Sequence, residues 1–73
     1  MDRQATIYTR KGCHLCDDAK RQLESYGFAV TMVDIDTDTT LLAQYDTEIP
    51  VVFINGKERF RGPINETLLQ RLL

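Results

Sequence analysis

The sequence predicts an α/β fold in which helices cover both faces of a four-stranded mixed sheet. A strand-like run, a helical segment and a second strand-like run fill residues 5–35, as in a right-handed βαβ unit with parallel strands. Asn55 and Gly56 join two further strand-like runs into a hairpin. An amphipathic segment follows, so the predicted element order is β-α-β-α-β-β-α.

The first half of the chain supplies the first three elements. Residues 5–9 are rich in β-branched and aromatic side chains, which is typical of a strand. Apolar side chains then recur at helical spacing, at Leu15, Ala19, Leu23 and Tyr26. Gly27 suits a left-handed helix stop, and residues 28–35 form the second strand-like run.

The second half contains a short helix, a hairpin and a last helix. Residues 36–45 combine several helix-capping side chains with an apolar stretch. Pro50 opens a buried-strand pattern over residues 50–54, and the return strand covers residues 57–61. In that return strand we expect Phe60 to point inward, and Arg59 and Arg61 to lie on the other face. Asn65 is a candidate N-cap of the last helix, whose apolar positions are Ile64, Leu68, Leu69 and Leu72.

Length and composition describe a small globular protein. The chain has 73 residues, enough for one domain, which we place at residues 1–73. A net charge of −2 gives no reason to expect a nucleic-acid partner, and we expect a monomer. No apolar run approaches the ~20 residues that cross a bilayer, so no membrane association is expected. Residues 1–4 lead into a strand and do not resemble a signal peptide, so we expect a cytoplasmic location.

Charge is distributed unevenly along the chain. Between Gln22 and Gly56 there is no Lys or Arg, but there are acids at Glu24, Asp34, Asp36, Asp38, Asp46 and Glu48. Basic residues gather at the two ends and include Arg10, Lys11, Lys57, Arg59 and Arg61. Alternating cations suit a solvated edge strand that must resist aggregation, and a partner-docking patch is the alternative.

The candidate reactive site is the pair Cys13 and Cys16, the two cysteines of the chain, at the junction of the first strand and first helix. A disulfide between them would close too small a loop to stabilise the fold, which favours chemistry over scaffolding. Unpaired N–H groups and the positive end of the helix dipole stabilise a thiolate at Cys13, and Arg10 and Lys11 add positive charge. Thiolate is the attacking species, so Cys13 is the predicted nucleophile and the more interior Cys16 resolves the mixed disulfide.

Other interpretations of the same residues stay open. His14 could stabilise the Cys13 thiolate or be an exposed loop residue. Two cysteines at this spacing are half of a zinc site, but the chain has no other Cys and its one His lies between them. A metal shared between two chains and a redox-inactive pair in a structural domain are the remaining alternatives.

The sequence resembles the thioredoxin superfamily, and glutaredoxins and glutaredoxin-like proteins most closely. The resemblance rests on residues 7–16, 33–36 and 49–56, and on Gly62 before the last helix. It implies a thioredoxin fold with a cis peptide bond before Pro50, which would lie against Cys13. It also implies that the backbone at Ile49 and Pro50 pairs with a bound peptide or glutathione. Further substrate contacts are expected from Arg10, Lys11, His14, Leu15 and Gly62.

Two departures from the glutaredoxin pattern concern the reductant. His14 and Leu15 replace the Pro-Tyr pair usual between the cysteines of glutathione-dependent members. Pro63 stands where a second glycine is usual, and it removes a backbone donor that could bind a carboxylate of glutathione. Arg10, Lys11 and Arg61 could still attract that carboxylate, but only loosely. We therefore expect weak glutathione binding and reduction by a dithiol donor or flavoprotein reductase.

The sequence thus predicts a thiol–disulfide oxidoreductase that reduces protein or mixed disulfides and donates electrons, with no resident cofactor or metal. Glutathione or a reductase would be the electron source. The alternative function is a redox-inactive thioredoxin-fold binding module that docks a protein or shares a metal between chains.

Overall fold

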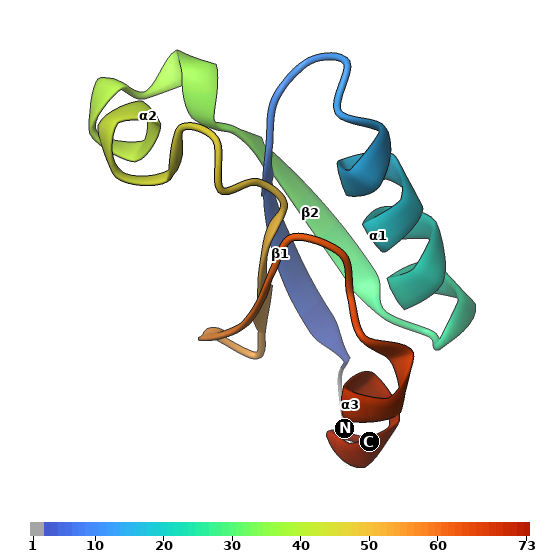
Figure 1. The fold of residues 1–73 in the computed structure, drawn as a ribbon. Helices are drawn as coiled ribbons and strands as arrows, with labels where there is room; N and C mark the ends of the chain where they lie inside the picture. Colours follow the sequence, from blue (N-terminus) through green and yellow to red (C-terminus); the bar gives the residue numbers. More distant parts are fainter. Residues whose placement is uncertain (1–2) are drawn as a thin grey trace.

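The computed structural model describes residues 3–73 and has the predicted element order. Its helices and strands, with a short 3-10 helix labelled η1, are β1 (Gln4–Thr9), α1 (His14–Ser25), β2 (Ala29–Asp34), η1 (Ile35–Thr37), α2 (Thr39–Tyr45), β3 (Val51–Ile54), β4 (Lys57–Arg61) and α3 (Glu66–Arg71) (Figure 1). The expectation about a signal peptide concerns Met1 and Asp2 in part, and these two lie outside the described residues.

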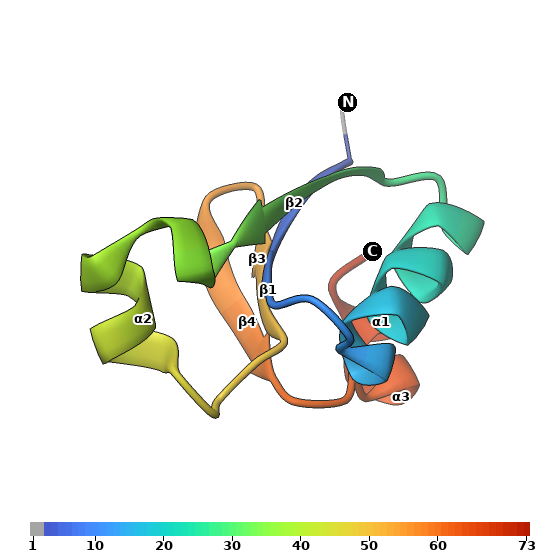
Figure 2. The same ribbon diagram turned by 90° about the horizontal axis from the view of Figure 1, so that it is seen from above.

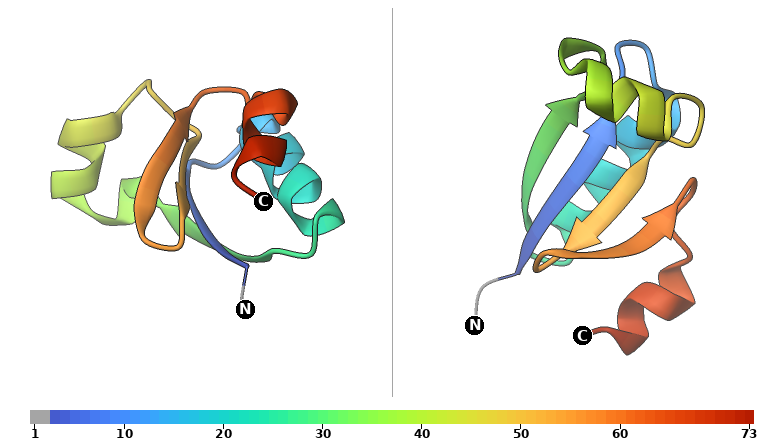
Figure 3. Two further views of the ribbon diagram at one scale, coloured as in Figure 1. Left: turned by 90° about the horizontal axis from the view of Figure 1, so that it is seen from below. Right: turned by 90° about the vertical axis from the view of Figure 1, so that its left-hand side faces the viewer.

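The four strands form one mixed sheet in the order β2-β1-β3-β4. β1 pairs with β2 in parallel and with β3 antiparallel, and β3 pairs antiparallel with β4. Helix α2 covers one face, whereas α1 and α3 lie on the other (Figure 2). Viewed onto the strands, β1 lies between β2 and β3, and β4 is an edge strand (Figure 3). The predicted fold class is confirmed.

Alternating side chains divide the sheet between two cores. Under α1 and α3, Ile7 and Val52 are fully buried together with Leu23 and Leu69. Under α2, Val51 packs with Ile35 and Tyr45, and the Tyr8 ring contacts both Tyr45 and Phe53. Because neighbouring strand residues point to opposite faces, Val51 and Val52 each serve a different core. The strands that carry the site are therefore held from both sides.

Two predicted boundaries differ from the structure. The second strand ends at Asp34, and Ile35 begins the 3-10 helix where a strand was expected. Asp38 then divides the predicted helix over residues 36–45, because its extended backbone and carboxylate cap α2 by accepting from the N–H groups of Thr40 and Leu41. The side-chain oxygen of Asp34 likewise accepts from the Asp36 N–H and starts η1. In this segment, hydrogen bonds that the Asp34 and Asp38 side chains accept from nearby backbone N–H groups set the element boundaries, against the continuous strand and helix that the residue pattern predicted.

A β-bulge alters the predicted face assignment in β4. Val51 lies opposite Arg61 and Val52 opposite Phe60, but Phe53 lies opposite Glu58, so Arg59 has no partner in the ladder. The extra residue reverses the alternation beyond it. Phe60 is buried and Arg59 and Arg61 are exposed, and Glu58 shares the face of Arg61, which regular alternation did not predict.

The last helix buries less of its apolar surface than predicted. Leu69 is fully buried, but Leu68 and Leu72 are 47% and 41% exposed. The helix is capped by Asn65, whose side chain accepts from the Leu68 N–H. A helix with six residues presents few positions to the sheet, and Leu69 takes the central one. Across residues 3–73, no helix has the length and apolar character that a membrane span requires.

Candidate active site

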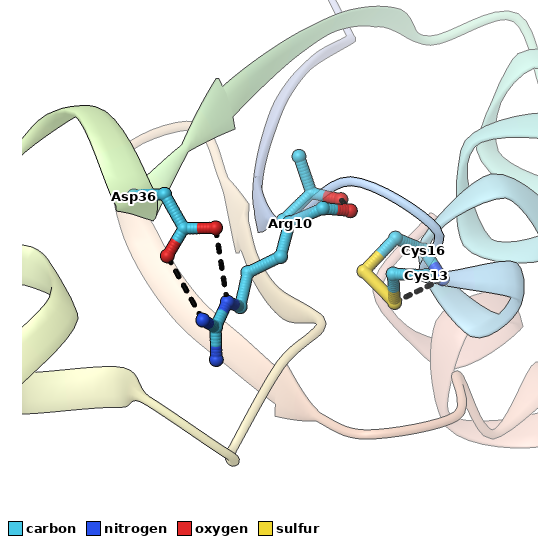
Figure 4. Close-up of a disulfide and its surroundings, with 5 residues drawn as sticks. Arg10, Cys13, Cys16 and Asp36 are labelled. Carbon is cyan, nitrogen blue, oxygen red and sulfur yellow. Dashed lines mark hydrogen bonds and ion pairs between the residues drawn. A yellow bond between two sulfur atoms is a disulfide. The ribbon is translucent and has the colours of Figure 1, made fainter.

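Cys13 and Cys16 form a disulfide at the start of α1, with their Cα atoms 5.3 Å apart (Figure 4). Cys13 is the N-cap of the helix and is partly exposed, whereas Cys16 lies in the first turn and is fully buried. The Cys16 N–H donates to the Cys13 Sγ at 3.1 Å. The sulfur of Cys13 thus occupies the place of an ordinary capping oxygen. Of the two cysteines, only Cys13 is exposed to any degree at the surface.

The loop before the helix aims Cys13 through local hydrogen bonds. Its N–H donates to the Arg10 carbonyl at 3.3 Å, and its carbonyl accepts from the Asp17 N–H at 3.2 Å. Gly12 has a φ of +78°, in the left-handed region that favours glycine. The turn and the first helical hydrogen bond therefore fix the backbone on both sides of Cys13.

Arg10 does not direct its charge at the cysteines. Its guanidinium contacts Asp36 at 3.0 Å and Asp46 at 3.1 Å, and its side chain extends away from the disulfide (Figure 4). The hydrogen bond and the charge of Asp36 raise the pKa of Arg10 further above its ordinary value. Its bonds tie the loop before Cys13 to η1 and to the end of α2.

Three other predicted contact residues, Lys11, His14 and Leu15, are exposed beside Cys13, and Leu15 is 47% exposed.

The segment with Pro50, a predicted contact region, is joined to the loop before α3. The Ile49–Pro50 peptide bond is cis, as the resemblance implied, and Pro50 is fully buried just before β3. The Pro50 carbonyl accepts from the Gly62 N–H at 2.8 Å. Gly62 has a φ of +84°, so this link also depends on a glycine. The structure thereby joins two predicted contact residues that are far apart in the sequence.

A surface pocket of about 260 Å³ lies beside this link, and its lining residues are Thr47, Glu48, Ile49, Arg61 and Gly62. Arg61 contacts Glu48 at 2.8 Å and Glu58 at 2.7 Å. Its hydrogen bond lowers the pKa of Glu58, and Glu58 in turn raises the pKa of Arg61. The guanidinium also lies over the Tyr45 ring, 5.3 Å from its centroid. Ile49 and Gly62 were predicted contacts, whereas Thr47 and the two glutamates were not.

The acidic partners of the two arginines are the residues that sequence reasoning missed. Asp36, Asp46 and Glu48 belong to the acid-rich stretch between Gln22 and Gly56, which has no Lys or Arg. That stretch could have indicated that these acids pair with arginines from elsewhere in the chain. Glu58 had no such signal, because regular alternation places it opposite to Arg61. Within residues 3–73, no three His, Cys, Asp or Glu side chains are grouped so as to hold a metal ion.

Taken together, the fold and the cysteine pair define a thioredoxin-fold protein of the glutaredoxin-like type. Residues 4–73 match the family described as Glutaredoxin-like domain (DUF836), and the chain belongs to that family. The predicted resemblance is confirmed.

Individual relatives agree with this assignment. The glutaredoxin-like protein NrdH of Salmonella typhimurium is 45% identical over 51 residues, which are 64% of this chain and 63% of that protein. The solution structure of protein Ne2328 from Nitrosomonas europaea has a TM-score of 0.85 at 25% identity, covering 100% of this chain and 93% of that one. NrdH-redoxin from Escherichia coli, whose structure is described as the basis of a thioredoxin-like activity profile, has a TM-score of 0.69 at 30% identity, with 96% and 95% covered.

Proposed function

We propose that this protein is a thiol–disulfide oxidoreductase that reduces disulfides in other proteins through Cys13 and Cys16. The observation that carries the proposal is the disulfide at the N-terminus of α1, in which Cys13 is partly exposed and Cys16 is buried. In the reduced protein, the same Cys16 N–H that now donates to the Cys13 Sγ would stabilise a thiolate there. The Arg10 side chain, which is paired elsewhere, is not needed for this effect.

The reaction follows from thiol–disulfide exchange. The Cys13 thiolate attacks one sulfur of the substrate disulfide, that bond breaks, and the other substrate sulfur leaves as a thiolate that takes up a proton. The deprotonated Cys16 then attacks the Cys13 Sγ and releases the first substrate sulfur as a thiolate, which is also protonated. The substrate gains two electrons and the protein returns to the disulfide form.

Substrate contacts are proposed on both sides of Cys13. Exposed Leu15 and His14 lie next to it on one side, with Lys11 in the preceding turn. The pocket at Ile49 and Gly62 is proposed as the second contact surface, where the backbone at Ile49 and Pro50 would pair with an extended substrate segment.

The electron donor is proposed to be a flavoprotein reductase or another dithiol protein. Pro63 removes one N–H from the loop before α3, which weakens any anion site for glutathione there. The thioredoxin-like activity profile named for the Escherichia coli relative supports the same choice. We place the activity in the cytoplasm, where reductases keep protein thiols reduced.

The test is a steady-state assay in which the protein reduces a protein disulfide with each donor in turn. A thioredoxin-type flavoprotein reductase should support turnover, and millimolar glutathione with glutathione reductase should support much less. Glutathione-driven turnover at the rate of an ordinary dithiol glutaredoxin would contradict the choice of donor. Failure of both donors, and of dithiothreitol, to support disulfide reduction would leave the binding-module alternative.

A further inference from the structure

The pocket beside Pro50 is lined by an arginine whose positive charge is offset by neighbouring carboxylates. Among the described residues, Arg61 alone of the pocket lining is cationic, yet three of its N–H groups already donate to carboxylates: two to Glu58 and one to Glu48. A guanidinium has about five N–H donors, so most of its hydrogen-bonding capacity is used. Tyr45 covers one face of the group. Arg61 is therefore poorly placed to bind a further anion.

The three side chains together carry excess negative charge. One guanidinium and two carboxylates sum to a net charge of −1 beside the pocket. The hydrogen bond from Arg61 favours the ionised form of Glu58, so this charge persists at neutral pH. We call Glu48, Arg61 and Glu58 the acidic triad.

The bulge in β4 makes this arrangement possible. In a regular strand, residues three apart point to opposite faces, and Glu58 could not form its paired hydrogen bonds with Arg61. With Arg59 as the extra residue, Glu58 lies opposite Phe53 on the face that carries Arg61 and Val51. The acidic triad therefore depends on a specific backbone irregularity.

Arg10, the other arginine near the site, has the same kind of environment. It contacts two carboxylates, Asp36 and Asp46, and this group also has a net charge of −1. The exposed cations that enter no ion pair among residues 3–73 include Lys11, two residues before Cys13, and Lys57 and Arg59 in β4. Each of the two arginine groups is thus acidic in sum, although the sequence shows an arginine at its centre.

We propose that the acidic triad is a specificity device: it selects substrate segments with a positive charge next to the reactive cysteine and disfavours anionic thiols such as glutathione. This inference rests on the proposed thiol–disulfide exchange and names the chemistry of its partner. A Lys or Arg that follows the substrate cysteine would enter the pocket and contact Glu48, which is 55% exposed. An incoming carboxylate would meet Glu48 and find Arg61 already occupied.

Small thiols of different charge measure this selectivity directly. A thiolate attacks Cys13 of the protein disulfide and Cys16 leaves, and a second thiol molecule then attacks the mixed disulfide. Two thiols become one small disulfide, and the protein gains two electrons as a dithiol. Apart from the thiolate sulfur, which all three share, glutathione carries a net charge of about −1, 2-mercaptoethanol carries none, and cysteamine carries about +1. Their different intrinsic reactivities cancel when each rate is expressed as the ratio of variant to wild type.

The decisive variant is Glu48→Gln, which removes one charge and frees one Arg61 donor. Relative to 2-mercaptoethanol, the glutathione rate should rise about threefold and the cysteamine rate fall by a similar factor, because exposed charge pairs have modest energies. The 2-mercaptoethanol rate measures the effect on the charge of the attacking sulfur alone, and high salt should remove the differences between the three thiols. Glu58→Gln should act in the same direction. As a substrate test, reduced wild-type protein should reduce a disulfide peptide with Lys beside its cysteine faster than one with Glu.

Glu24→Gln is the matched control. It makes the same change in net charge, but eleven helical positions separate it from Cys13, a rise of roughly 16 Å along α1. If Glu48→Gln leaves the glutathione-to-cysteamine ratio at the wild-type value, or shifts it no more than Glu24→Gln does, the specificity proposal is wrong. If no thiol exchanges with the wild-type disulfide at all, the proposed function fails and this inference fails with it.

Discussion

The cysteine side of the site, residues 10–16, is held mainly by hydrogen bonds between near neighbours, whereas the proline side is held by contacts between distant segments. Cys13 is fixed by the Arg10 carbonyl, the Asp17 N–H and the Cys16 N–H, all within four residues. The proline side instead joins the segment before β3 to the end of β4, through the Gly62 hydrogen bond and the acidic triad. In the proposed function, reactivity is therefore a local property of this chain, and the proposed selection of partners depends on its tertiary structure.

The largest effect is expected from removing either cysteine. Cys13→Ser should lose all disulfide exchange, because the remaining thiol, Cys16, is fully buried. Cys16→Ser should still attack but be unable to resolve, so mixed disulfides with substrate should accumulate. Mass spectrometry of each variant after incubation with a disulfide peptide measures this. Equal adduct formation by both variants would mean that the two roles are wrongly assigned.

The next largest effect is expected on the stability of the proline side, when the buried side chain of α3 is removed. Leu69 is the buried anchor of α3, the helix that follows the Gly62 loop. Leu69→Ala should lower the free energy of unfolding by about 3 kcal/mol, from lost burial and the cavity left behind.

The neighbouring Leu68→Ala is its control, since Leu68 is 47% exposed and the change should cost less than about 0.5 kcal/mol. Urea denaturation compares the two variants. Equal losses would show that α3 docks through a different face from the one described.

The smallest effect is a pH dependence on the proline side. The Arg61 hydrogen bond lowers the pKa of Glu58 from 4.5, so the folded protein holds this carboxylate ionised at a pH where the unfolded chain binds a proton. Its contribution to stability is complete above about pH 4.5 and is lost as the pH falls through the lowered pKa. Thermal unfolding between pH 6 and pH 3 should show a slightly shallower acid decline for Glu58→Gln and for Arg61→Met. An unchanged decline in both variants would mean that the ion pair adds no stability in solution.

The same division explains how far sequence reasoning reached. The cysteine pair, the helix that begins beside it and the Asn55-Gly56 turn were all predicted, because neighbouring residues determine each of them. The turn has the expected positive φ at both positions, 50° and 86°. Family resemblance supplied the cis bond before Pro50, which local pattern alone does not indicate.

What the sequence did not reveal depends on register and packing. The bulge at Arg59 placed Glu58 beside Arg61 against the two-residue alternation. Arg10 was expected to support the Cys13 thiolate, yet its guanidinium contacts two carboxylates in η1 and after α2. Leu68 and Leu72 fit an apolar stripe that the short helix α3 does not bury. In each case the deciding partner lies in another element of the fold.

The central claim is that the helix start makes Cys13, and not Cys16, the reactive thiol. The direct measurement is alkylation of the reduced protein by iodoacetamide between pH 5 and pH 9, with each cysteine followed by mass spectrometry. An ordinary thiol, with a pKa of about 8.5, is almost wholly protonated at pH 6 and reacts slowly there. The account predicts rapid alkylation of Cys13 at pH 6 while the buried Cys16 stays unmodified. Slow alkylation of both cysteines at pH 6, rising together above pH 8, would contradict it.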